Sequence, residues 1–193
     1  MILLIDNYNS FSYNLYQMIG EINPNIKVVR NDELSLSEIE AINPESIVIS
    51  PGSGRAKDAG ITIDLIKKFY DKIPILGICL GHQGIYEAFG GNISYSKTLM
   101  HGKSSTIVID NKNPLFYNLD SEISVGRYHS LSAIEETLPK DLSIIAKSKD
   151  DNEIMAIVHN DYPVYGLQFH PESILSVDGF EILKNFLNCT IQW

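Results

Sequence analysis

The sequence has little of what marks membrane-spanning, exported or nucleic-acid-binding proteins. No stretch approaches the roughly 20 apolar residues that a membrane-spanning helix needs. The apolar segment 1–5 is interrupted by Asp6 and has no basic flank, so we expect no signal peptide. No run of lysines or arginines occurs, and 15 Lys+Arg against 24 Asp+Glu give a formal net charge of −9. Such a charge disfavours nucleic acid and anionic membranes as partners.

Cysteine is also scarce, since the chain has Cys79 and Cys189 and no others. Two cysteines form neither a disulfide framework nor a zinc-binding spacing, which together with the lack of an export signal predicts a cytoplasmic protein. No low-complexity segment, repeat or linker interrupts the 193 residues, of which 44% are hydrophobic and 20% charged. This composition is typical of a globular protein, and we expect residues 1–193 to form a single domain.

The first half of the chain alternates short β-branched runs with amphipathic stretches. Strands are expected at 2–5, 26–29, 46–50 and 74–78, and helices at 11–19, 35–41 and 58–70. Apolar strands separated by helices predict βαβ units, and therefore a parallel sheet that is covered on both faces.

The second half has closely spaced strand candidates with turn sequences between them. The strands are expected at 106–110, 122–126, 142–146, 154–159 and 164–169, and a last helix at 179–187. Short connections of this kind predict antiparallel pairing. The predicted fold class is therefore α/β, with three layers and a mixed, mostly parallel central sheet.

The most informative segment is 73–89, in which an apolar strand leads through Gly77-Ile-Cys-Leu-Gly81 into a helical stretch. This is the G-x-S-x-G pattern of a nucleophile elbow, with Cys79 in place of serine. The flanking glycines allow a sharp turn that presents the thiol at a helix N-terminus, where the thiolate is favoured. A lone cysteine is more often a small buried hydrophobe, which is how we interpret Cys189.

His170 is the best candidate for the base among the five histidines. It follows the predicted strand 164–169, and in an open α/β sheet the strand ends at one edge form the site. Glu172 can return to the imidazole, fix its tautomer and stabilise its charged form. His82 is expected to follow the helix rather than face the thiol. The alternative for 170–172 is a solvated turn, but together with Cys79 these residues predict acyl transfer through a thioester.

Acyl transfer also needs hydrogen-bond donors for the oxyanion. The N–H of Leu80, directly after the nucleophile, is one candidate, and the glycine loop Ser50-Pro-Gly-Ser-Gly54 can supply another. Neither this loop nor the Gly102-Lys103-Ser104 segment has the spacing of a nucleotide-binding loop, because Lys57 and Lys97 stand where glycine is needed.

Three motifs together resemble the class I (triad) glutamine amidotransferases: Gly77-Ile-Cys-Leu-Gly-His-Gln83, Ser50-Pro-Gly-Ser-Gly54 and Gln168-Phe-His-Pro-Glu-Ser173. The resemblance covers essentially the whole chain and implies their flavodoxin-like fold. Segments 6–15, 100–103 and 127–131 are similar to the branch that serves chorismate enzymes. That branch comprises anthranilate synthase component II and the amidotransferase subunit of aminodeoxychorismate synthase.

The resemblance implies hydrolysis of L-glutamine through a γ-glutamyl thioester on Cys79, followed by delivery of ammonia to a partner. It implies that His170 is the base and acid and that Glu172 orients it. The implied oxyanion donors are the amides of Gly54 and Leu80. The implied glutamine-binding residues are Gly52, Ser53, Gly54, Gln83, Ser130 and Leu131, the last two through their backbone.

The sequence departs from the family pattern at three places. One is Arg55-Ala56, where the family usually has a threonine or valine followed by proline. Ser53 stands where the family usually has proline, so the oxyanion role of Gly54 rests on a looser loop, and Asn9 stands where the family usually has aspartate. Phe11 and Tyr13 lie in the same N-terminal motif, and we interpret both as structural.

The implied partner is a chorismate-binding synthase subunit, which is component I of anthranilate synthase or of aminodeoxychorismate synthase, or both in turn. No cofactor or metal is expected in this chain, and magnesium is expected in the partner. We expect docking around residues 8–12 and 101–103, with local packing as the alternative role of these loops. The rival functions are a stand-alone γ-glutamyl hydrolase and a non-catalytic binding module.

Overall fold

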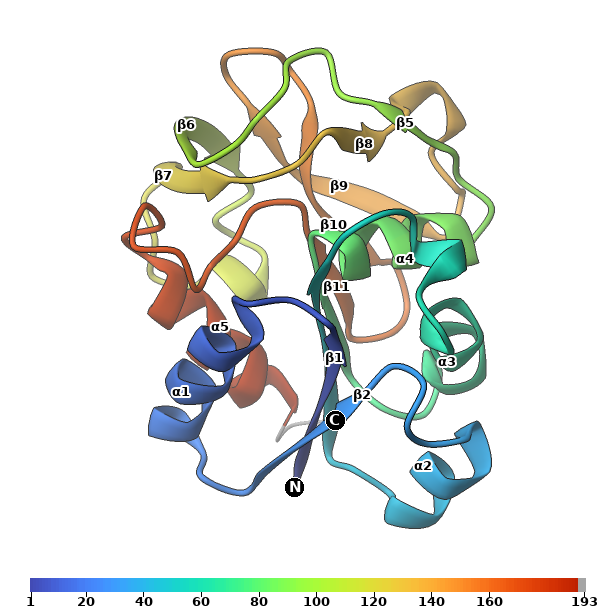
Figure 1. The fold of residues 1–193 in the computed structure, drawn as a ribbon. Helices are drawn as coiled ribbons and strands as arrows, with labels where there is room; N and C mark the ends of the chain where they lie inside the picture. The colour runs from blue at the N-terminus through green and yellow to red at the C-terminus, as the bar shows by residue number, and fades with distance from the viewer. Residues whose placement is uncertain (191–193) are drawn as a thin grey trace.

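The fold is built around a nine-stranded sheet within residues 1–190, the part of the chain that the computed structural model describes. The strand order is β2-β1-β3-β4-β11-β10-β9-β6-β7 (Figure 1). The strands are β1 (Ile2–Asn7), β2 (Ile26–Arg30), β3 (Ser46–Gly52), β4 (Ile75–Ile78), β6 (Lys103–Ile109), β7 (Glu122–Arg127), β9 (Leu142–Ser148), β10 (Ile154–His159) and β11 (Val164–Leu167).

One half of the sheet is parallel and the other is antiparallel. Strands β2, β1, β3, β4 and β11 run parallel to their neighbours. From β11 outward, β10, β9, β6 and β7 pair antiparallel. Strand β11 joins the two halves, because it pairs parallel with β4 and antiparallel with β10. The predicted mixed sheet is confirmed.

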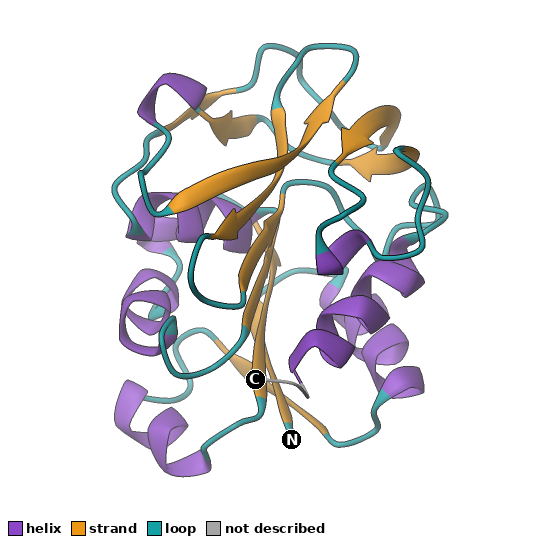
Figure 2. Cartoon of the chain, turned by 180° about the vertical axis from the view of Figure 1, so that it is seen from behind, coloured by secondary structure: helices purple, strands orange, loops and turns teal. Residues whose placement is uncertain are grey.

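Helices cover both faces of the parallel half, which gives the three predicted layers (Figure 2). The helices are α1 (Ser12–Ile22), α2 (Leu36–Ile42), α3 (Thr62–Phe69), α4 (Leu80–Ala88) and α5 (Gly179–Thr190). Apolar residues of α1 and α5 join one hydrophobic core, and those of α2, α3 and α4 join a second core on the opposite face. No helix within residues 1–190 combines the length and apolarity needed to cross a membrane.

Local sequence signals explain where two of these helices begin. Ser35 and Glu38 form a capping box at the start of α2, in which each side chain accepts from the other residue's backbone N–H. The helix expected at 58–70 begins only at Thr62. Gly60 has φ +52°, and a Cβ there would lie 2.3 Å from the carbonyl oxygen of Asn31, so this position forms a turn rather than the first helical turn.

A second, two-stranded sheet was not expected from the sequence. It pairs β5 (Ile93–Tyr95) with β8 (Leu131–Ala133) antiparallel. Each strand has three residues, which is too short for a recognisable period of two. Strand β8 carries Leu131, so this small sheet contributes to the placement of a predicted glutamine-binding residue.

Candidate active site

Cys79 occupies a strained turn between β4 and α4. Its φ of +51° and ψ of −98° lie in a region that non-glycine residues rarely adopt. A Cβ at Gly77 would lie 2.4 Å from the backbone of Gly81, and one at Gly81 would lie 2.7 Å from the carbonyl oxygen of Ile49. Both glycines are therefore needed for the tight turn, and the predicted nucleophile elbow is present.

The elbow places the thiol at the start of α4. Helix α4 begins at Leu80, directly after the cysteine, rather than at the expected residue 83. The backbone N–H of Cys79 donates to the carbonyl of Leu167 at 2.7 Å, which continues the pairing of β4 with β11 beyond the strand ends. The nucleophile therefore lies at the carboxyl edge of the parallel strands, next to the segment that carries the candidate base.

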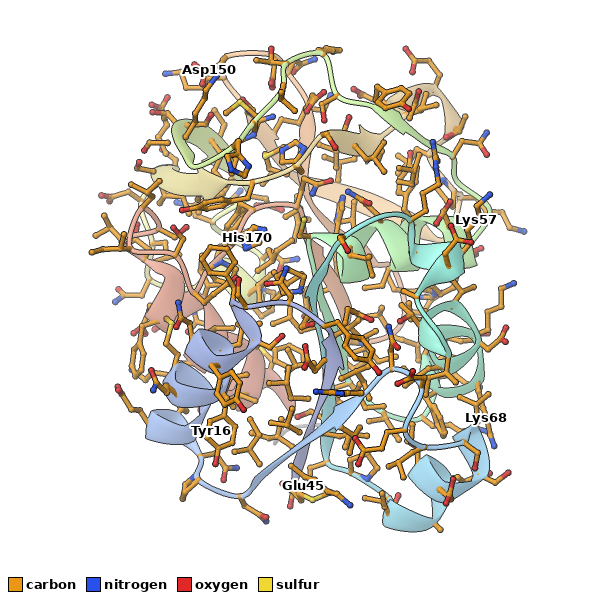
Figure 3. All side chains as sticks on the ribbon, in the orientation of Figure 1. Tyr16, Glu45, Lys57, Lys68, Asp150 and His170 are labelled. Atoms are coloured by element: carbon orange, nitrogen blue, oxygen red, sulfur yellow. The ribbon has the colours of Figure 1, made fainter. Side chains whose placement is uncertain are left out.

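His170 and Glu172 form a buried pair three residues beyond β11. Nδ1 of His170 lies 2.7 Å from Oε1 of Glu172, and the two side chains are 3% and 0% exposed. The backbone N–H of His170 donates to Gly126 of β7, and its carbonyl accepts from the Ser176 hydroxyl at 2.6 Å. These contacts hold the backbone of His170 in place, and with it the imidazole. In Figure 3, His170 lies inside the molecule above the middle of the view, and Glu45 lies at the lower edge.

The electrostatics of the pair favour an imidazolium. Burial lowers the pKa of His170, but attraction from Cys79 and Glu172 outweighs it and raises the pKa to about 10. Nε2 of His170 has no hydrogen-bond partner within residues 1–190. A charged imidazole beside a thiolate is the state required for nucleophilic attack.

Two aromatic rings pack on His170, the predicted base. The ring centroids of Tyr128 and Phe11 lie 4.9 Å and 5.4 Å from that of His170, and 5.2 Å from each other. Phe11 of the N-terminal motif thus packs against His170, which agrees with a structural role. Tyr13 is 76% exposed and makes no comparable contribution to the core. Asn9 accepts from the N–H of Phe11 at 2.8 Å, a role that aspartate would also perform.

The structure brings the predicted glutamine-binding residue Gln83 close to the nucleophile. Its Nε2 donates to the carbonyl oxygen of Leu131 at 3.1 Å and to Oε1 of Gln168 at 3.2 Å. Ser130 is exposed next to Leu131, and its carbonyl accepts from the N–H of Ser96. Glutamine binding by these groups stays a prediction. The structure places Gln83 against Leu131, with Ser130 next to it.

The glycine loop lies beside Leu80 where β3 ends. A Cβ at Gly52 would lie 3.0 Å from the Leu80 side chain, so the loop and the elbow are in contact. Ser53 and Gly54 are exposed, and Gly54 has φ +76°, which serine or proline would adopt only with strain. The oxyanion role of Gly54 and Leu80 stays a prediction.

His82 and His129 are buried but belong to the surroundings of the site. Burial lowers the pKa of His82 to about 3, and burial together with the charge of Arg127 lowers that of His129 to about 4. Neither ring nitrogen of His82 has a hydrogen-bond partner within residues 1–190. His82 fits because Gly166 has no side chain, since a Cβ there would lie 2.7 Å from Nδ1. Both imidazoles are neutral at neutral pH and cannot replace His170.

The buried neutral His82 makes the fold sensitive to acid. Between pH 6.5 and 3 the unfolded chain protonates this histidine and the folded chain does not, so stability falls as the pH falls. The free energy of unfolding should drop by about 3 kcal/mol at pH 4 from this group alone. Urea denaturation between pH 7 and 4 should show a shallower loss in His82→Leu, whereas exposed His101→Leu should follow the wild type. Equal slopes in all three proteins would contradict this.

A buried ionic cluster around Arg127 was not found from the sequence. The guanidinium is 0% exposed and donates to Asp151 and Glu153, at 2.9 Å each. Its Nε donates to Nε2 of His129 at 3.0 Å. Glu153 also accepts from the hydroxyl of Ser132 in β8 at 3.0 Å. The cluster therefore ties β7 to the small sheet that carries Leu131.

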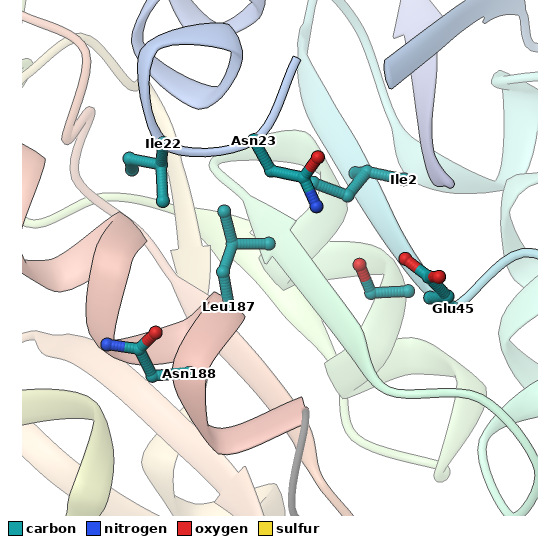
Figure 4. A pocket seen from close by; sticks show the side chains of 7 residues that line it. Ile2, Ile22, Asn23, Glu45, Leu187 and Asn188 are labelled. Carbon is teal, nitrogen blue, oxygen red and sulfur yellow. The ribbon is translucent and has the colours of Figure 1, made fainter. Parts of the chain in front are cut away.

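A hollow elsewhere on the molecule has no comparable chemistry. It measures about 470 Å³ and is lined by Ile2, Ile22, Leu187 and neighbouring residues (Figure 4). Ile2 begins β1, so this hollow lies at the amino edge of the parallel strands, opposite to Cys79. Within residues 1–190 no three His, Cys, Asp or Glu side chains gather as a metal site. We place the functional site at the elbow.

The fold and the Cys79 elbow are those expected of an acyl-transfer enzyme with a cysteine nucleophile, and the buried pair of His170 and Glu172 is the predicted base with the carboxylate predicted to orient it. The family model for class-I glutamine amidotransferases matches residues 3–189. The chain belongs to this family, whose activity uses a cysteine nucleophile, as the elbow predicts.

Curated relatives cover nearly the whole chain. It is 49% identical over 187 residues to "Aminodeoxychorismate/anthranilate synthase component 2" of Bacillus subtilis, covering 97% of this chain and 95% of the relative. It is 48% identical over 191 residues to "Anthranilate synthase component 2" of Saccharolobus solfataricus, covering 96% and 97%. It is 51% identical over 189 residues to "Bifunctional protein TrpGD" of Thermotoga maritima. That match covers 97% of this chain but 32% of the relative, so the chain spans about a third of that protein.

A solved structure supports the fold independently. The crystal structure of a putative GMP synthase protein from Thermoplasma acidophilum matches with a TM-score of 0.87 at 27% identity, covering 99% of this chain and 94% of that one. The α/β fold with its mixed sheet is thus found in a second protein with little sequence in common.

Proposed function

We propose that this chain is a glutaminase subunit that hydrolyses L-glutamine and delivers the ammonia to a chorismate-utilising synthase, in the first place anthranilate synthase. The observation that carries the proposal is the strained Cys79 elbow beside the buried pair of His170 and Glu172. Relatives of nearly equal length that are named for anthranilate synthase support the choice of partner.

The proposed reaction proceeds in two halves. The Cys79 thiolate attacks the side-chain amide carbon of glutamine, and the charge moves to the carbonyl oxygen, where the Leu80 and Gly54 amides are proposed to donate. The carbon–nitrogen bond then breaks as the His170 imidazolium gives its proton to the nitrogen, and ammonia leaves. A water molecule transfers a proton to His170 and attacks the thioester, which releases glutamate and restores the thiolate.

The partner is proposed to dock on the loops that contain Tyr8, Phe11 and His101. Tyr8 is 56% exposed, and its ring lies under the Arg30 guanidinium at 4.7 Å. Phe11 and His101 both contact the ring of Tyr128, which packs on His170. A partner that covers these loops would contact Phe11 and His101, which are separated from His170 by no more than the ring of Tyr128. The magnesium of the synthase is proposed to lie in the partner, where chorismate binds.

A covalent label tests the glutaminase half of the proposal. An electrophilic glutamine analogue should modify Cys79 and spare Cys189 at neutral pH. Burial raises the pKa of Cys189, so little of its thiolate is present. Peptide mass spectrometry locates the label, and excess L-glutamine should protect Cys79. A label on Cys189, or labelling of Cys79 that glutamine leaves unchanged, would refute the assignment.

Two alternatives remain distinct from this proposal. The relative from Bacillus subtilis is named for both synthases, which favours a glutaminase shared between anthranilate and aminodeoxychorismate formation. A stand-alone γ-glutamyl hydrolase would be fully active without any partner. Assaying glutamine hydrolysis by the isolated chain and with each type of synthase partner separates these possibilities.

A further inference from the structure

Gln168 is a buried polar residue that the mechanism above does not use. It follows β11 directly, and its side chain is 0% exposed between the nucleophile and Gln83. Its Nε2 lies 3.7 Å from Sγ of Cys79, in hydrogen-bonding geometry, and its Oε1 accepts from Nε2 of Gln83 at 3.2 Å. Because both ends of this buried amide make hydrogen bonds, the positions of its oxygen and its nitrogen can be assigned.

The surrounding hydrogen bonds determine which end of the amide faces the sulfur. The carbonyl oxygen of Leu131 can only accept, so Gln83 must present its amino group there. The same amino group reaches Gln168, whose nearer atom must therefore be the oxygen. The nitrogen of Gln168 is left to donate to Sγ of Cys79.

The same logic extends outward to the buried ionic cluster. Nε2 of His129 accepts from the Arg127 guanidinium, so the proton of the imidazole is on Nδ1. Nδ1 lies 3.0 Å from the carbonyl oxygen of Leu131 and donates to it. A continuous series of hydrogen bonds thus runs from Arg127 through the Leu131 carbonyl, Gln83 and Gln168 to the nucleophile. Every donor in this series is assigned.

We propose that Gln168 is a further catalytic residue, whose side-chain amide stabilises the Cys79 thiolate and links the sulfur to the glutamine-binding side chain Gln83. The inference rests on the proposed glutaminase function. A donor aimed at sulfur is most effective when the sulfur is negatively charged, which is before attack and again when the thioester is hydrolysed. The amide carries no proton to or from the sulfur, and His170 keeps the roles of base and acid.

The test follows the reactivity of Cys79 toward iodoacetamide, a small reagent that needs no glutamine pocket. In Gln168→Met the side-chain length is kept and the donor is lost, so the alkylation rate measured at a pH below the midpoint of the wild-type profile should fall about tenfold. The pH midpoint of the rate should rise by about one unit, so that alkaline pH restores the reaction. Gln168→Glu should react more slowly still, because its carboxylate repels the thiolate.

Gln17→Met, the same change at an exposed position of α1, is the matched control and should react like the wild type. Cys189 provides an internal control, since its labelling should not change in any variant. Unchanged rate and midpoint for Cys79 in folded Gln168→Met would overturn the inference. If wild-type protein hydrolyses glutamine in that case, the proposed function stands and only the role of Gln168 fails.

A measurement on the wild-type protein covers the case in which Gln168→Met does not fold. Alkylation of Cys79 should shift a buried glutamine side-chain amide pair in a ¹⁵N-resolved NMR spectrum, because the acceptor of its hydrogen bond has changed. A spectrum in which no glutamine side-chain amide moves would also overturn the inference.

Discussion

Cys79→Ala should abolish glutamine-dependent product formation in the complex with the synthase partner and leave ammonia-dependent formation intact. The variant has no nucleophile for the thioester, and removal of a nucleophile costs at least about a thousandfold in turnover. Ammonia supplied in the buffer bypasses this chain, because the acceptor reaction is proposed to occur in the partner. Alanine is smaller than cysteine and has the same Cβ, so we expect the turn at this residue, where φ is +51°, to be kept.

The experiment compares turnover with glutamine and with an ammonium salt, using each type of synthase partner in turn. Cys189→Ala is the matched control and should retain both activities, since this residue is in α5 and half-buried away from the elbow. Loss of both activities in a correctly assembled Cys79→Ala complex would contradict the division of labour. Retention of both would show that another residue is the nucleophile.

Arg127→Met should destabilise the fold more than any change at a surface charge. It removes the cation between Asp151 and Glu153, whose side chains are 8% and 3% exposed, and leaves their charges buried without compensation. Removing one partner of such a pair costs about 3–5 kcal/mol. The matched control is Lys149→Met, because the bridge from Lys149 to Glu122 is about half exposed at both ends and is worth about 0–1 kcal/mol.

Urea denaturation at pH 7 measures both effects as differences in the free energy of unfolding. Adding Glu153→Gln to Arg127→Met should recover part of the loss, because the second change removes one uncompensated charge. The loss in the free energy of unfolding for Arg127→Met could instead lie within about 1 kcal/mol of the control, which is the value of a surface pair. That result would show that water or a rearranged side chain solvates the carboxylates.

The architecture, the elbow at Cys79 and the contact of His170 with Glu172 could be predicted because their signals are local. The βα alternation, the glycines around Cys79 and the His170–Glu172 spacing each depend on residues within a few positions of one another. The structure confirms the three layers and the elbow, and it brings the histidine segment to the same sheet edge through the pairing of β4 with β11.

The features that escaped prediction depend on contacts between distant segments. The burial of Arg127 arises from carboxylates 24 and 26 residues further along the chain, and nothing near Arg127 in sequence indicates it. The contact of Gln168 with Cys79 spans 89 residues. Sequence patterns indicate which face of a strand is buried, but they do not indicate which polar atoms will meet there.

The position of β11 has a consequence for how the enzyme becomes active during synthesis. It is the last strand within residues 1–190, yet it lies between β4 and β10 near the middle of the sheet. A nascent chain that ends before residue 164 therefore has unpaired edges on both strands, and these are surfaces that aggregate. Because Gln168 and the predicted base His170 lie within three residues of the end of β11, the same late insertion that closes the sheet also brings both residues to the Cys79 edge. We therefore expect chains that end before β11 to have no glutaminase activity.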